Sequence, residues 1–205
     1  HVGATPVLAD VNPNTMNLDP AQVARRISPR TRVLLPVHFA GRPCDMDELL
    51  QLAGRHQLTV IEDCAHAIET RYRGRPAGTL GDFGCFSFYA TKNITTAEGG
   101  MVLAGRPEDL DRIRRLSHHG LSQGAWRRFA DEGYKHYQVV EPGFKYNMTD
   151  VQAALGFHQL RRIEDGWARR QVVWRRYQEG FEGLPLVRPP EPAPDTRHSL
   201  HLYTI

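Results

Sequence analysis

The chain has 205 residues, of which 40% are hydrophobic and 24% charged, and its formal net charge is +3 with a pI near 8.9. This composition is typical of a globular protein rather than of a disordered chain, and the positive charge is too small to indicate nucleic-acid binding. No stretch approaches the roughly 18 apolar residues of a membrane-spanning helix, so we expect no membrane partner. Cys44, Cys64 and Cys85 have neither CxxC spacing nor a disulfide framework, which predicts a reducing, cytoplasmic location.

Strands and helices are expected to alternate along the first half of the chain. The apolar patterns predict strands at 7–11, 31–38 and 58–61. A helix is expected to begin at Asp19-Pro20, where a capping carboxylate precedes proline, and another at Asp45 or Asp47. This alternation predicts an α/β fold with a mixed, mostly parallel sheet flanked by helices. In such sheets ligands bind beyond the carboxyl ends of the strands.

The second half begins with a hairpin near 72–75 and a buried, aromatic strand at 83–89. Thr149 and Gln152 form a capping box that begins a helix at about Asp150. The remaining expected segments are a strand at 101–104, a helix from Pro107, a long connection at 121–142, a helix at 168–182 and a proline-rich linker at 185–194. His1 is not a methionine, and the chain reads as an internal segment of a longer protein.

Two chemically matched residues each follow a buried strand. Asp63 ends the strand at 58–61, and Lys92 follows the strand at 83–89. A lysine in apolar surroundings has a lowered pKa, which suits an amine nucleophile, although a loop lysine on the surface is the alternative. A carboxylate and an amine at one sheet edge match pyridoxal phosphate (PLP), whose pyridine nitrogen pairs with the acid and whose aldehyde joins the amine. A plain Asp–Lys salt bridge explains the same spacing.

Two further residues fit the same interpretation. His66 is either a hydrogen-bond partner of a bound ring or a satisfied core residue, and Ser87 is either a phosphate ligand or a small residue that permits close packing. His118-His119 lacks zinc-site spacing, so no metal site is expected. The sequence contains no GxSxG elbow, no GxxxxGK[ST] loop and no GxGxxG after a strand.

Several ordered blocks together resemble one family, the DegT/DnrJ/EryC1/StrS aminotransferases. The blocks are Gly3 to Val11, Val60 to Ala67, Gly81-Asp82, Phe86 to Asn93, Glu98 to Gly100 and Pro142 to Ala154. The resemblance implies a fold-type I PLP-dependent enzyme that aminates a nucleotide-linked keto-deoxysugar, typically with L-glutamate as the donor. The product is expected to be an amino sugar for a surface polysaccharide or a glycosylated natural product.

The resemblance also implies roles for individual residues. Lys92 corresponds to the lysine that binds PLP covalently and carries the proton, and Asp63 to the partner of the pyridinium nitrogen. His66 takes a position near the phenolic oxygen of the ring, and Ser87 binds the phosphate. Asn147 corresponds to an asparagine that reaches the phosphate of the neighbouring subunit, which implies a homodimer with shared sites. We expect residues 1–145 to form a partial PLP-binding large domain, and residues 146–205 the interdomain helices and the start of a small α+β domain.

Two other functions remain open. A PLP-fold sugar dehydratase carries histidine in place of the lysine, so Lys92 opposes that alternative. A non-catalytic, dimerising relative is favoured only by incomplete ends, because the family has an upstream phosphate-binding loop and a C-terminal domain that are missing or incomplete here. The sugar, its nucleotide and the aminated carbon, 3 or 4, are not specified by the sequence.

Overall fold

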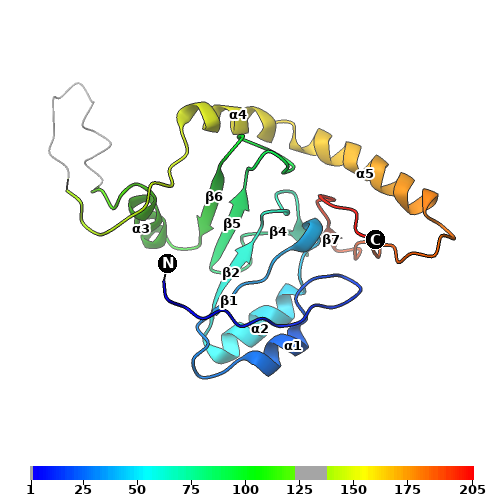
Figure 1. Cartoon of the computed structure of the whole chain (residues 1–205), viewed down its shortest axis with the longest axis horizontal. Coiled ribbons are helices and arrows are strands. Elements are labelled where there is room, and N and C mark those ends of the chain that lie inside the picture. The colour runs from blue at the N-terminus through cyan, green and yellow to red at the C-terminus, as the bar shows by residue number, and fades with distance from the viewer. Residues whose placement is uncertain (1, 123–137) are drawn as a thin grey trace.

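The computed structural model describes residues 2–122 and 138–205, and its centre is a mixed, mostly parallel sheet (Figure 1). The strands are β1 (Val33–Leu34), β2 (Thr59–Asp63), β5 (Phe83–Ser87) and β6 (Gly100–Ala104), in the order β1-β2-β5-β6. β1 and β5 both run parallel to β2, whereas β6 is antiparallel to β5. The predicted fold class is therefore confirmed.

α2 (Met46–His56) packs on the sheet and α1 (Pro20–Arg26) packs on α2, and together they form the main core. In α1 the Asp19 side chain caps the first turn by accepting a hydrogen bond from the amide of Ala21 at 2.8 Å, as predicted. α2 buries its apolar face against β2. The buried side chains of this core are Val23, Leu34, Cys44, Met46, Leu49, Ala53, Leu58, Val60 and Leu80.

A small second sheet ties the end of the chain to the first half. The predicted hairpin is formed by β3 (Arg71–Tyr72) and β4 (Arg75–Pro76), and β7 (Thr196–Arg197) pairs antiparallel with β3. Beyond β7 the chain runs along the 3-10 helix η1 (Phe39–Gly41), where the amides of Ser199 and His201 donate to the carbonyls of Gly41 and Ala40, each at 3.0 Å.

Three further helices flank the sheet (Figure 1). α3 (Pro107–Ser117) packs against β6, and α4 (Asp150–Leu160) and α5 (Ile163–Gly180) follow one another across the carboxyl end of β5. The Thr149 capping box at the start of α4 is present, as predicted. α4 has no buried residue and exposes most of its apolar side chains. Within the described ranges, no helix combines the length and the apolar character that crossing a bilayer requires.

Several predicted boundaries were wrong. No strand forms at 7–11, where Val7 and Leu8 are exposed and only Val11 makes an isolated bridge. The strand expected at 31–38 is reduced to β1 and a bridge at Val37, because Pro36 between them has no amide hydrogen to donate. The last helix begins at Ile163, earlier than predicted. Most of the predicted connection at 121–142 lies outside the described residues.

Candidate active site

Asp63 and Ser87 lie at the same edge of the sheet. Asp63 is the last residue of β2 and Ser87 the last residue of β5, and the parallel register places Asp63 beside Cys85. Parallel neighbours end on the same side, and their backbones lie only about 5 Å apart. The predicted ligand edge thus carries a carboxylate and a hydroxyl on adjacent strands.

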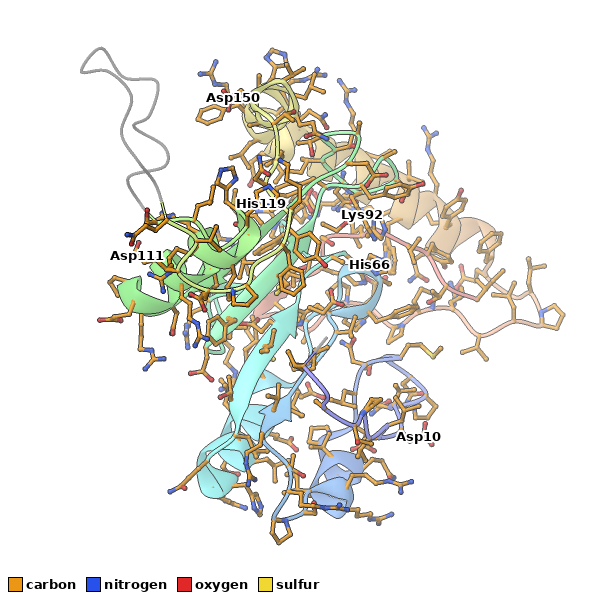
Figure 2. All side chains as sticks on the ribbon, turned by 60° about the vertical axis from the view of Figure 1, so that its left-hand side comes forward. Asp10, His66, Lys92, Asp111, His119 and Asp150 are labelled. Carbon is orange, nitrogen blue, oxygen red and sulfur yellow. The ribbon has the colours of Figure 1, made fainter. Side chains whose placement is uncertain are left out.

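Lys92 follows β5 in a turn that is fixed by backbone hydrogen bonds. Its amide donates to the Tyr89 carbonyl at 3.0 Å. The Phe88 amide donates to the Gly99 carbonyl, and the Phe88 carbonyl accepts from the Thr96 amide, each at 2.9 Å. The side chain is half-buried, and its Nζ has no hydrogen-bond or ion-pair partner in the described part of the chain. Figure 2 shows Lys92 and His66 close to one another at this end of the sheet. The amine is therefore partly shielded from solvent and has no partner among the described residues.

Asp63 and Lys92 both act electrostatically on His66. Burial lowers the pKa of the His66 imidazole, the nearby charge of Lys92 lowers it further, and Asp63 opposes both. Oδ1 of Asp63 accepts a hydrogen bond from the amide of Ala65 at 2.9 Å, whereas Oδ2 has no partner among the described residues. The alternative of a plain salt bridge is not formed, since no ion pair within 4.0 Å joins Asp63 to Lys92.

The two residues predicted to contact the phosphate lie in different parts of the structure. The hydroxyl of Ser87 accepts a hydrogen bond from the amide of Tyr89 at 3.4 Å, at the start of the Lys92 turn. Asn147 precedes α4, and its Oδ1 accepts a hydrogen bond from the ammonium of Lys145. No hydrogen bond in the described chain links Asn147 to Asp63, His66, Ser87 or Lys92. The sheet edge thus brings four of the five predicted residues together.

A polar network beside Lys92 was not predicted from the sequence. Asn93 donates from Nδ2 to the Glu69 carboxylate at 2.8 Å, and its Oδ1 lies 2.8 Å from Nδ1 of His201. Arg170 of α5 forms an ion pair with Glu69, and its Nε donates to the Ser199 carbonyl at 3.1 Å. No local pattern predicts this network, because its members come from segments far apart in the chain. A charged residue at position 69, between Ile68 and Thr70, was the one available signal.

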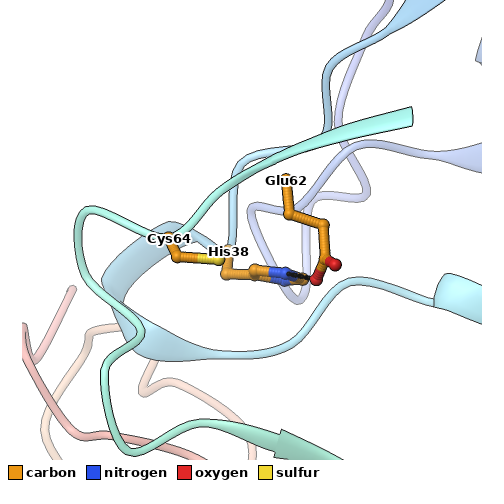
Figure 3. Close-up of side chains that lie close together, drawn as sticks. All are labelled: His38, Glu62 and Cys64. Carbon is orange, nitrogen blue, oxygen red and sulfur yellow. Dashed lines mark hydrogen bonds and ion pairs between the residues drawn. The ribbon is translucent and has the colours of Figure 1, made fainter. Parts of the chain in front are cut away.

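On the buried side of β2, His38, Glu62 and Cys64 lie close enough together to resemble a metal site (Figure 3). Nδ1 of His38 accepts a hydrogen bond from the amide of Cys44 at 3.1 Å, so Nε2 carries the proton that is donated to Glu62 at 2.9 Å. Burial raises the pKa of the Cys64 thiol and disfavours the thiolate that metals prefer.

Glu62 also accepts hydrogen bonds from the amides of Gly78, Leu80 and Gly81 at 2.7–2.8 Å. Burial opposes its ionisation, but the hydrogen bonds from His38, Gly81 and Gly78 outweigh burial and lower the pKa of this carboxyl. The three residues are therefore best explained as a structural network that ties β2 to the segment entering β5.

Comparisons with known proteins identify the family of the chain. The model of the DegT/DnrJ/EryC1/StrS aminotransferase family matches residues 1–205. The spore coat polysaccharide biosynthesis protein SpsC of Bacillus subtilis is 48% identical over the whole chain, which spans 53% of that protein. The chain thus has about half the length of this curated relative.

Solved structures show the same likeness. A putative sugar aminotransferase of Streptococcus pneumoniae in its PMP form matches with a TM-score of 0.89 and 34% identity, over 99% of this chain and 54% of that one. The same protein was also solved in a PLP form. DesV of S. venezuelae matches with a TM-score of 0.86 and 39% identity, over 98% of this chain and 51% of that one.

Proposed function

Because the chain belongs to the DegT/DnrJ/EryC1/StrS aminotransferase family, we propose that the whole protein is a PLP-dependent sugar aminotransferase. It moves an amino group from an amino acid, L-glutamate, to a nucleotide-linked keto-deoxysugar, and so makes an amino sugar. The observation that carries this proposal is the half-buried, unpaired amine of Lys92 beside Asp63 and His66 at the carboxyl edge of the sheet. The three free cysteines suit a cytoplasmic protein.

The residues at this edge fit PLP, which is the cofactor of the family and is present in a solved relative. The aldehyde of PLP requires an amine, and its pyridine nitrogen requires a carboxylate with an unused oxygen. Its phenolic oxygen requires a donor such as an imidazole, and its phosphate requires a hydroxyl. When bound, PLP supplies an electron sink for the carbon from which a proton is removed.

Each side chain then has a defined task. Nζ of Lys92 would hold the cofactor and, once released, would move a proton as general base and acid. The carboxylate of Asp63 would bind the pyridine nitrogen and keep it protonated. The His66 Nδ1 accepts a hydrogen bond from the amide of Ala40 at 3.3 Å, so the neutral ring carries its proton on Nε2 and offers a donor to an anionic oxygen.

We assign Asn147 to the phosphate site of a partner subunit. This assignment is supported by its position before α4, without contact to the other four residues, and by the exposed apolar surface of α4, where Val151 and Phe157 are 76% and 70% exposed. Contiguous exposed apolar surface is typical of protein interfaces. A homodimer with shared sites therefore completes the proposed enzyme.

The function is tested by incubating the intact protein and PLP with L-glutamate and a panel of keto-deoxysugar nucleotides. The proposal predicts that 2-oxoglutarate and an amino sugar nucleotide form in equal amounts. Dehydration of the sugar without consumption of glutamate would favour the dehydratase alternative, because that reaction needs no amino donor. Absence of amino transfer with every sugar and amino acid tested would contradict the proposal.

A further inference from the structure

We propose that His201 is a positioning residue for the transamination, because its ring stacks on His66 while Asn93, the neighbour of Lys92, holds its other edge. This inference rests on the proposed roles of His66 and Lys92. His201 does not itself touch the reacting atoms. It fixes the ring plane and the protonated nitrogen of His66.

The His66 ring is fixed by aromatic contacts. His201 stacks on it with ring centroids 4.4 Å apart and an interplanar angle of 30°. Phe39 meets it edge-on at 6.2 Å. Offset stacked and edge-to-face contacts of this kind favour one orientation of a ring. Removing His201 therefore leaves Phe39 as the one aromatic neighbour of His66 among the described residues.

The hydrogen bonds define the tautomer of His201. The Asn93 amide donates from Nδ2 to Glu69 at 2.8 Å and to the Ser199 carbonyl at 3.3 Å, so its Oδ1 is the atom that accepts. His201 must then carry its proton on Nδ1, which lies 2.8 Å from Oδ1. The stacked rings are thus oriented by two different anchors, Asn93 for His201 and Ala40 for His66.

The segment that carries His201 is attached rigidly to the site. The Ser199 hydroxyl donates to the carbonyl of His66, and the Ser199 amide donates to Gly41. The contact with Gly41 is so close that a Cβ there would overlap Ser199 Oγ. Arg170 holds the same segment through the Ser199 carbonyl and pairs with Glu69. The position of His201 is therefore set by the contacts of Ser199 and by its own amide, which donates to the Ala40 carbonyl at 3.0 Å.

The charges around the ring pair favour uncharged imidazoles. Burial, followed by the nearby His66, Lys92 and Arg170, lowers the pKa of His201 to about 4. Glu69 is the anion of this network, but it is engaged by Asn93 and Arg170. Two neutral rings can stack without like-charge repulsion, and they place no further cation beside Lys92.

The test compares three variants of the intact protein. His201→Ala removes both contacts, His201→Phe retains a stacking ring without the hydrogen bond, and His201→Gln retains a donor without the ring. His56→Ala, an exposed histidine at the end of α2, is the matched control. Nitrogen-15 NMR of the cofactor-free protein reports the tautomer and the pKa of His66, and steady-state kinetics with PLP report kcat and KM.

We expect His201→Ala to raise the pKa of His66 and mix its tautomers, and to lower kcat about ten- to a hundredfold with little change in KM. His201→Phe should keep the pKa of His66 low and retain more of kcat than His201→Gln. If His201→Ala does not fold, the comparison of His201→Phe with His201→Gln tests the proposal instead. An unchanged His66 signal and unchanged kcat in folded His201→Ala would overturn the proposal. Failure of the proposed function has a different signature, since the wild type would then lack PLP-dependent turnover whatever the NMR spectrum showed.

Discussion

Glu62 and Asp63 are consecutive residues of β2, yet their carboxylates lie in opposite surroundings. Glu62 is fully buried and accepts hydrogen bonds from His38 and three backbone amides. Asp63 is half-buried at the candidate active site, with one oxygen unused. Successive side chains of a strand point to opposite faces of the sheet, which explains the separation. One strand end thus supplies a structural acid and the acid that we propose binds PLP.

Glu62→Gln is expected to destabilise the fold by about 3–5 kcal/mol near neutral pH, because an amide group cannot replace a buried anion that four donors face. The carboxyl has a lowered pKa in the folded state, so its contribution is present above its usual pKa and is lost as the pH falls through the folded value. Urea unfolding should therefore show a difference between wild type and variant that shrinks in acid. Exposed Glu179→Gln is the control, with an expected change below about 0.5 kcal/mol. An equal effect of both substitutions would contradict the account.

Asp63→Asn is expected to lower kcat by about 100-fold or more, because the amide no longer stabilises a charged pyridine nitrogen. PLP should still be linked to Lys92, so this variant should bind PLP normally while its kcat falls. Asp10→Asn, at an exposed position, should leave kcat unchanged. Full activity of Asp63→Asn would remove Asp63 from the proposed site.

The buried His198 should make the protein sensitive to mild acid. Burial, followed by the charge of Arg42, lowers the pKa of this histidine to about 3. The unfolded state then binds more protons between the usual histidine pKa and that value, so stability falls as the pH drops through this interval. One such group contributes a slope of up to about 1.4 kcal/mol per pH unit.

His198→Asn keeps an acceptor for the amide of Leu200, which now donates to Nδ1 at 2.9 Å, but cannot take up a proton. The variant should show a flatter loss of unfolding free energy between about pH 6 and pH 4. His201 titrates in the same interval and is present in both proteins, so it does not affect the difference. Exposed His56→Asn should follow the wild-type curve, and a His198→Asn curve with the same slope would contradict the prediction.

The assignment of Asn147 to the partner's site can be tested by mixing inactive subunits. In a dimer of Lys92→Ala with Asn147→Ala, one of the two sites combines the intact Lys92 of one subunit with the intact Asn147 of the other. Random mixing should therefore restore about a quarter of the wild-type sites when PLP is limiting. No recovery on mixing would place Asn147 in the site of its own subunit.

The residues that follow buried strands could be predicted from the sequence. Asp63 and Lys92 each lie at the end of an apolar run, and the topology of alternating strands and helices places such ends at one edge. His201 and Arg170 could not be predicted in this way, because their contacts depend on β7 returning the chain to β3 and η1. The apolar pair Val7-Leu8 led to a wrong strand prediction. A strand also needs a neighbouring strand for its backbone hydrogen bonds, and an apolar pattern does not reveal whether one is present.

Borohydride reduction of the PLP-loaded intact protein tests whether Lys92 is the residue that holds PLP. Reduction makes the lysine linkage permanent, and mass spectrometry of the peptides then identifies the labelled residue. The chain contains only three lysines, Lys92, Lys135 and Lys145, so the assignment is unambiguous within it. We expect the label on Lys92 and no visible absorbance band of lysine-bound PLP in Lys92→Ala. A label on another lysine, or a band that persists in Lys92→Ala, would contradict it.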